Sequence, residues 1–228
     1  MIEAAFLGTI IPLLLLVVVL RHSRPMMLTF CWGMSAFVVA YLAGGVAARA
    51  LGVTAAGSSY AVFVAPPMEE LLKSLPLFYF LFRGKKTFVP FIYIFGMAAG
   101  IGFAIEENLL YLINRHTEIL SSLLLMIVRS FSTCLMHGVA TAVIGFAFTT
   151  ARRVRRNSGR RITLLAALLV ALGGYAAAVS LHGAYNYVLL SRWHPLAVLA
   201  PGLLFVFGAI LLKRAETQAP ETKRTVWR

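Results

Sequence analysis

The sequence contains no aspartate, and charged residues make up only 13% of its 228 positions. Eight glutamates supply all of its side-chain carboxylates, and hydrophobic residues account for 60% of the chain. A soluble domain of this length needs far more charged surface than this composition provides. The composition therefore excludes an ordinary soluble protein and predicts a membrane protein.

Cysteine is also scarce, and the two that occur, Cys31 and Cys134, lie in separate apolar stretches. They form neither a metal-binding spacing nor a disulfide framework, so we interpret both as small core residues. The N-terminus lacks the positive segment of a cleavable signal peptide. We therefore expect its apolar run to remain as the first membrane span.

The formal net charge of +13 comes from 21 basic residues. A basic patch can be the footprint of nucleic-acid binding. Here, however, the basic residues stand in short clusters between apolar runs, which is where membrane proteins carry positive anchors. The charge distribution predicts contact with a lipid bilayer and no nucleic-acid partner.

Apolar stretches long enough to cross a hydrocarbon core of about 30 Å, roughly 20 residues each, recur along the chain. They predict an all-α polytopic membrane protein with about seven transmembrane helices. The expected spans are residues 2–20, 27–48, 60–82, 90–113, 120–150, 162–190 and 195–213. Residues 1–213 would form a single transmembrane domain with its catalytic core at about 60–190, followed by a polar cytosolic tail at 214–228.

Several ionisable residues lie inside these spans, where each costs several kcal/mol and by default marks a functional site. They are Glu69, Glu70, Lys73, Glu106, Glu107, Arg129, His137 and His182. Lys73 follows Glu69 by four residues and Glu70 by three, so either carboxylate can meet the ammonium group on one helix face. The other carboxylate would then be free for catalysis.

Helical spacing also relates polar residues in later spans. His182 and Asn186 are four residues apart and share a face, which suits a ligand and a supporting hydrogen bond. Arg129 lies two turns before His137, roughly 12 Å along the axis, and is expected near the outer interface. In the third span the prolines at 66 and 67 predict that the helix proper begins near Ala65.

These residue types suit metal-assisted hydrolysis. Two histidines and one glutamate form a ligand set for catalytic zinc, which lowers the pKa of a bound water to about 7. Glu107, His137 and His182 are the candidate ligands. Glu69 or Glu70 would serve as general base, and the sequence does not decide between them. A metal-free mechanism with a glutamate-activated water remains open.

A proton- or cation-coupled transporter is the alternative, because buried glutamates and histidines also build proton relays in membrane proteins. Transporters of this type commonly contain internal repeats with interrupted helices. The sequence shows no such repeat, which favours the hydrolase.

Four motifs, each in a different predicted span, resemble those of the PrsW family of intramembrane proteases, relatives of the CAAX prenyl protease and Abi group. The motifs are EELLK at 69–73, GFAIEEN at 102–108, MHG at 136–138 and HGAYN at 182–186. The resemblance favours Glu107 over Glu106, because the family glutamate immediately precedes an asparagine. It also implies supporting roles for Lys73, Asn108 and Asn186.

The resemblance further implies a multi-pass protein in the plasma membrane of a prokaryote. Its expected substrates are membrane-anchored proteins, of which single-span, anti-sigma-factor-like proteins are the family example. The expected activity is therefore that of an intramembrane peptidase, of metallo or glutamic type, with zinc as the predicted cofactor.

The loop charges predict the orientation of the chain. Sixteen basic residues fall in the first, third and fifth loops and the tail, whereas the intervening loops hold only Arg49, Arg115 and Arg192. The positive-inside tendency then places the N-terminus outside and the C-terminus in the cytosol. Reporter fusions at Ser158 and at the C-terminus are expected to give cytosolic readings, and a periplasmic reading at either site would contradict this topology.

Overall fold

The structure is a computed structural model of the full chain. It describes residues 24–55, 57–82, 92–113, 119–157, 162–191 and 196–204, together with the single positions 10, 14 and 206. Within these residues all regular structure is helical. The prediction of an all-α protein is therefore confirmed for the described part of the chain.

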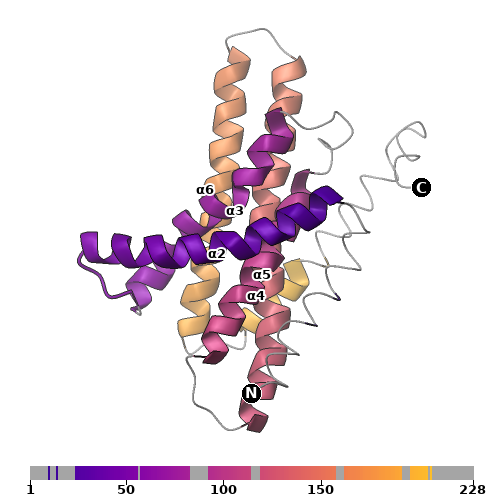
Figure 1. Ribbon diagram of the computed structural model, residues 1–228. Coiled ribbons are helices and arrows are strands. Elements are labelled where there is room, and N and C mark those ends of the chain that lie inside the picture. Colours follow the sequence, from indigo (N-terminus) through magenta and orange to yellow (C-terminus); the bar gives the residue numbers. More distant parts are fainter. Residues whose placement is uncertain are drawn as a thin grey trace.

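Six helical elements from residue 24 to residue 190 follow one another in the described part of the chain. They are α2 (Arg24–Ala50), η1 (Tyr60–Val64), α3 (Ala65–Phe82), α4 (Ile92–Ile113), α5 (Ile119–Asn157) and α6 (Ile162–Leu190). In Figure 1, α5 and α6 run side by side, and α2 crosses the bundle at a steep angle. The short element η1 is a π-helical turn that leads directly into α3.

Four of the described helices contain segments long and apolar enough to cross a membrane: Arg24–Ala50, Ile92–Ile113, Ile127–Arg155 and Leu164–Leu190. They match the predicted second, fourth, fifth and sixth spans. The predicted third span forms η1 and α3, but α3 has three charged residues among its 18 and is not apolar enough to count with the others.

The two predicted end spans are described only in part. Most of residues 2–20 lies outside the described residues, and of the predicted last span residues 196–204 are described and helical. The number of seven spans and the orientation of the termini therefore stay predictions. The third-span helix is expected to begin near Ala65. The α-helix α3 starts there, but the π-helical turn η1 precedes it without a break, so helical structure begins earlier in the chain.

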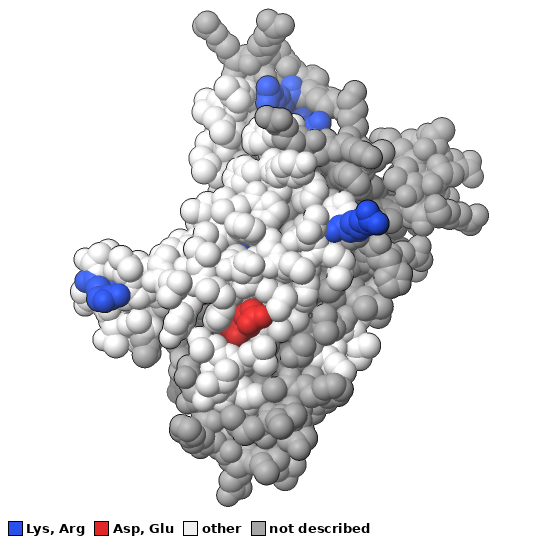
Figure 2. All heavy atoms as spheres, viewed as in Figure 1, with Lys and Arg blue, Asp and Glu red and all other residues white. Residues whose placement is uncertain are grey.

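The outer surface of the helices is strongly apolar. On α6, Leu165, Leu168, Leu169 and Leu172 are each at least half exposed. Figure 2 shows most of the described surface on one face as uncharged, with Lys and Arg side chains towards the edges of the molecule. Lipid is the solvent that suits such a surface.

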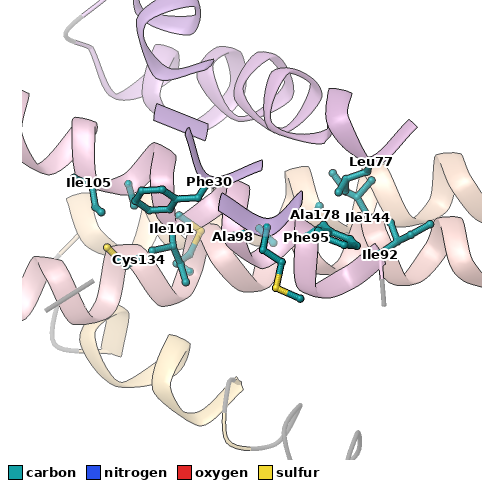
Figure 3. Packing of buried hydrophobic residues seen from close by; sticks show 14 of the residues in the cluster. Phe30, Leu77, Ile92, Phe95, Ala98, Ile101, Ile105, Cys134, Ile144 and Ala178 are labelled. Carbon is teal, nitrogen blue, oxygen red and sulfur yellow. The ribbon is translucent and has the colours of Figure 1, made fainter. Parts of the chain in front are cut away.

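The helix α4 lies at the centre of the packing and contacts α2, α3 and α5. Its residues Ile92, Phe95, Ile101 and Ile105 are buried in a core that also includes Leu77 of α3 (Figure 3). Because lipid tails are as apolar as leucine, helices in a bilayer associate through close packing. A central helix that is buried along most of its length fits that requirement.

Glycines bring the backbone of α4 unusually close to its neighbours. A Cβ atom on Gly100 would lie 2.2 Å from the carbonyl oxygen of His137 in α5, and one on Gly96 would lie 2.5 Å from that of Thr141. Towards α2, a Cβ atom on Gly102 would lie 2.2 Å from the carbonyl oxygen of Phe30. Small residues four apart, as at 96 and 100, permit such approach between membrane helices.

Prolines interrupt the backbone hydrogen bonds around α3, and side chains of other helices replace them. Pro76 has no N–H for the carbonyl of Leu72, which instead accepts a 2.9 Å hydrogen bond from Trp32 Nε1 of α2. In the π-helical turn the N–H of Ala65 bonds to the carbonyl of Tyr60, and residue 66 is a proline without an N–H. Neither residue therefore donates to the carbonyl of Ala61. The carbonyl of Ala61 accepts a 2.8 Å hydrogen bond from the Asn186 amide of α6.

The glycine contacts predict how the bundle responds to one added methyl group. Gly100→Ala is expected to destabilise the protein by about 1–3 kcal/mol, because the new Cβ must push the α5 backbone away. Gly173→Ala in α6 is the matched control, since nothing lies within 4 Å of its Cβ position. Thermal unfolding of the two detergent-solubilised variants checks this, and equal melting temperatures would contradict the close α4–α5 contact.

Candidate active site

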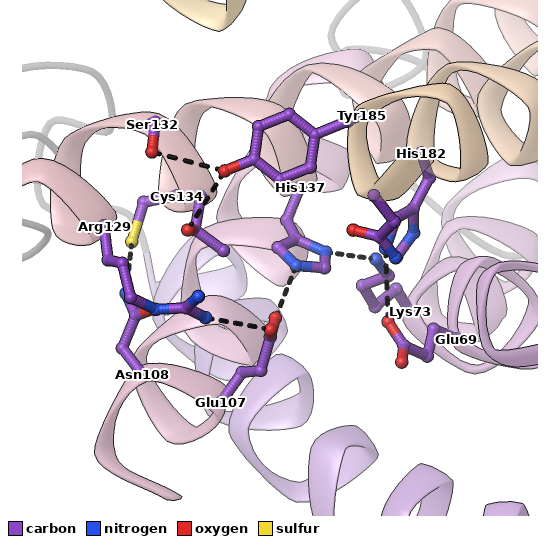
Figure 4. A network of polar contacts seen from close by, with 12 residues as sticks. Glu69, Lys73, Glu107, Asn108, Arg129, Ser132, Cys134, His137, His182 and Tyr185 are labelled. Carbon is purple, nitrogen blue, oxygen red and sulfur yellow. Dashed lines mark hydrogen bonds and ion pairs between the residues drawn. The ribbon is translucent and has the colours of Figure 1, made fainter. Parts of the chain in front are cut away.

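The structure gathers the predicted ionisable residues of four helices into one cluster. Glu69, Glu70 and Lys73 come from α3, Glu107 from α4, His137 from α5 and His182 from α6. Figure 4 shows the side chains of Glu69, Lys73, Glu107, His137 and His182 pointing towards one another between the helices. The His137 and His182 rings lie edge to face with centroids 4.6 Å apart.

Glu70 is fully buried and has a donor on both of its oxygens. Lys73 Nζ lies 2.5 Å from Oε1 as a salt bridge, and Thr141 Oγ1 donates to Oε2 over 2.9 Å. His182 Nδ1 is 3.0 Å from Oε1. The structure thus selects Glu70 as the partner of Lys73, and it leaves Nε2 of His182 as the ring nitrogen that faces Glu69.

Lys73 also determines the hydrogen bonding of His137. Its ammonium nitrogen is buried, lies 2.8 Å from His137 Nδ1, and sits 4.7 Å from the centre of the Phe103 ring. An ammonium group only donates, so His137 Nδ1 accepts and the ring proton is on Nε2. His137 Nε2 then donates to Glu107 Oε2 over 2.7 Å.

Glu107 is held between His137 and a second cation. Arg129 Nη2 lies 3.1 Å from Glu107 Oε1, and Arg129 Nε donates to Asn108 Oδ1 over 3.1 Å. The position of Arg129 two turns from His137 along the helix predicts a place near the outer interface, and this depth stays a prediction. Its side chain is buried and reaches Glu107 in the cluster.

Glu69 differs from the other two carboxylates. Its Oε2 atom is buried without a hydrogen-bond partner, and His182 Nε2, at 3.7 Å, is its ion-pair contact among the described side chains. Glu70 and Glu107 are paired with Lys73 and Arg129, respectively. The cluster therefore holds one carboxylate more than its cations match, and that carboxylate is Glu69.

This surplus carboxylate fits a bound cation. Ligand atoms of Glu69, His137 and His182 lie within 4.8 Å of one another, and no other such group of three occurs among the described residues. A buried oxygen without a donor beside two imidazoles is the donor set of a zinc site. The sequence prediction used Glu107 as the carboxylate ligand. In the structure Glu107 contacts His137 at 2.7 Å, whereas Glu69 is the carboxylate that is grouped with both histidines.

The two carboxylates beside the histidines resemble the outer shell of a metal site. His182 has Glu70 on Nδ1, and His137 has Glu107 on Nε2. A metal-binding histidine usually donates its other ring N–H to such a group, which orients the ring. Lys73 Nζ lies 2.8 Å from the remaining nitrogen of His137, Nδ1.

Two predicted supporting residues act on neighbours of the cluster. Asn108 accepts from Arg129, and its amide lies 3.8 Å from the buried Cys134 sulfur. Asn186 shares a helix face with His182 as predicted, but its amide donates to the backbone of Ala61 in η1. Sequence reasoning missed Thr141, although its position four residues after His137 places both on one face.

Comparison with known proteins points to a single family. The model of a family described as "PrsW family intramembrane metalloprotease" matches residues 21–212. A protein named "Protease PrsW" from Geobacillus kaustophilus (strain HTA426) is 27% identical over 145 residues, which is 62% of this chain and 58% of that relative. The matched region thus spans less than two thirds of the relative's length. No solved structure matches the chain.

The contacts predict different outcomes for the two adjacent glutamates. Glu70→Gln should destabilise the protein by roughly 3–5 kcal/mol, because it leaves the buried Lys73 without a counter-charge. Glu69→Gln should leave stability unchanged or slightly higher, since the lost charge has no matching cation. Melting temperatures of the purified variants test this, and an equal loss in both would contradict the pairing of Glu70 with Lys73.

Proposed function

The chain belongs to the PrsW family of intramembrane metalloproteases, and on this basis we propose that it hydrolyses peptide bonds of membrane-anchored proteins. The reaction would take place at the cluster of Glu69, His137 and His182. One observation carries the proposal: Glu69 Oε2 is a buried carboxylate oxygen with no hydrogen-bond donor, next to two buried imidazoles.

In this proposal Glu69 is the carboxylate that acts on the attacking water. Glu70 and Glu107 accept hydrogen bonds on both oxygens, so the position most readily available to a water proton is a carboxylate oxygen that has no donor. Glu69 Oε2 has that position. The side chain of Glu69 is 20% exposed, which gives water a route to the carboxylate.

The remaining polar residues keep the cluster in place. Lys73 neutralises Glu70 and bonds to His137, so it links α3 to α5. Glu70 orients the His182 ring so that Nε2 faces Glu69, and Glu107 orients the His137 ring. A rigid arrangement of this kind reduces the reorganisation needed during reaction.

We further propose that Glu69, His137 and His182 hold a zinc ion. Glu69 would then be a ligand rather than the free base, and Lys73 would release Nδ1 of His137, because Glu107 holds Nε2. When bound, zinc polarises the substrate carbonyl and lowers the pKa of water in its open position. The description of the family as metalloproteases supports this assignment, as does the donor set of the three residues. Glu107, the carboxylate ligand predicted from the sequence, would then support His137 through hydrogen bonding.

The family match favours a protease over the transporter alternative. We propose a plasma-membrane location in a prokaryote, as expected from the Geobacillus relative. The proposed partners are lipid and a membrane-anchored protein substrate. Single-span proteins of the anti-sigma-factor type are the first substrates to test.

Cleavage of a single-span substrate by the purified protein in liposomes tests the proposed function. Glu69→Gln is expected to lower turnover by at least about 10²-fold while the protein stays folded, the scale typical of general acid–base groups. His182→Ala should be equally impaired. Ser191→Ala, which changes a hydroxyl at the end of α6, is the control and should cleave normally. Normal turnover by Glu69→Gln would contradict the proposal.

Metal content measured on the same samples tests the zinc assignment separately. With Glu69, His137 and His182 as ligands, Glu69→Gln and His182→Ala should lose zinc together with activity, whereas Glu107→Gln should keep most of its zinc. If Glu107→Gln lost its zinc and Glu69→Gln kept it, the ligand set predicted from the sequence, with Glu107 as the carboxylate, would be correct instead. An active protein without bound metal would contradict the zinc site. Glu69 would then activate the attacking water without a metal ion.

A further inference from the structure

Arg129 is the one buried cation of the cluster that no recognised motif includes. Its guanidinium group is enclosed on several sides: Nη2 bonds to Glu107, Nε bonds to Asn108, and the Tyr111 ring centre lies 3.9 Å from Cζ. Charged groups inside a membrane protein are costly unless paired. The three contacts fix the guanidinium at the end of the cluster opposite Lys73 (Figure 4).

The carboxylate of Glu107 is shared between Arg129 and His137. Oε1 accepts from Arg129 Nη2 at 3.1 Å, and Oε2 accepts from His137 Nε2 at 2.7 Å. A carboxylate held by one donor can rotate about its terminal bond, whereas donors on both oxygens fix its plane. The side chain of Glu107 is 34% exposed, so without Arg129 it has room to turn away from His137.

The orientation of Glu107 decides which nitrogen of His137 carries the proton. Lys73 requires an acceptor at Nδ1, and a carboxylate at Nε2 requires a donor there. Both contacts select the same tautomer, with the proton on Nε2. Loss of the Glu107 contact leaves only Lys73 to select it.

We infer that Arg129 is a positioning residue for the reaction, which acts through Glu107 to hold the ring and the tautomer of His137. This inference rests on the proposed function. The side-chain contacts of Arg129 are with Glu107, Asn108 and the Tyr111 ring, and none of them reaches Glu69 or His182. Its effect on catalysis must therefore pass through the carboxylate of Glu107.

The first measurement is the ¹⁵N spectrum of the histidine side chains in the full-length protein in lipid nanodiscs after treatment with a chelator, so that no metal fixes the tautomer, with His137 assigned by its absence in a His137→Asn variant. The wild-type protein is expected to show His137 as the Nε2–H tautomer. Arg129→Gln should show a mixture of tautomers. Arg152→Gln is the control, because Arg152 also joins two helices, by a hydrogen bond to the carbonyl of Leu81, and does not touch the cluster.

The second measurement is the kinetics of cleavage per folded molecule. Arg129→Gln should lower kcat by about 10–100-fold, the usual effect of losing a group that orients a ligand, with KM changed by less than about two-fold. Arg152→Gln should alter the melting temperature but neither kcat nor the His137 spectrum. The double variant Glu107→Gln/Arg129→Gln should be no slower than Glu107→Gln alone, since both changes break the same link.

Arg129→Lys keeps the test decisive if Arg129→Gln does not fold. Its ammonium group retains the charge but cannot bond to Glu107 and Asn108 with the fork of a guanidinium. It is expected to give intermediate values of kcat and of the Nε2–H fraction. A wild-type spectrum and wild-type kcat in Arg129→Lys, or in a folded Arg129→Gln, would overturn the inference. A wild-type protein that cleaves nothing would contradict the proposed function instead, and the spectra would still decide the role of Arg129.

Discussion

A charged group inside a hydrocarbon layer must find a partner within the protein, and this requirement arranges the centre of the molecule. Glu70 and Lys73 pair on α3, and Glu107 on α4 pairs with Arg129 on α5. His137 joins the two pairs through its ring nitrogens. The Glu107–Arg129 pair and both contacts of His137 join two helices, and the Glu70–Lys73 pair holds Lys73 in place against His137. The helices therefore cannot shift independently without exposing a buried charge.

Glu69 is an exception to this pairing, because its buried Oε2 atom has no hydrogen-bond partner. Buried polar atoms without a partner are rare in folded proteins and need an explanation. Its neighbour Glu70 takes the structural role with Lys73, Thr141 and His182. Glu69 can then keep an oxygen for a proton or a cation. Two identical side chains adjacent in the chain thus have different roles because they leave α3 in different directions.

Some of this arrangement could be predicted from the sequence. Spacing within one helix predicts that Lys73 meets one of the two glutamates, and the ionisable residues inside the predicted spans single out Glu107, His137 and His182. Contacts between helices depend on side-chain direction and reach, which spacing does not give. For this reason the sequence predicts neither the bond from Arg129 to Glu107 nor the bond from Asn186 to η1.

The proline interruptions around α3 bear on the order in which the protein is assembled. The carbonyl of Leu72 in α3 depends on Trp32, which is synthesised earlier. The carbonyl of Ala61 in η1 depends on Asn186, which is synthesised more than a hundred residues later. With three charged residues and incomplete backbone bonding, α3 is a poor membrane span by itself. A nascent chain that has not yet inserted α6 also lacks His182. The helix that carries Glu69 is therefore completed at the same stage of biogenesis as the cluster around it, and a partly synthesised chain contains no finished site.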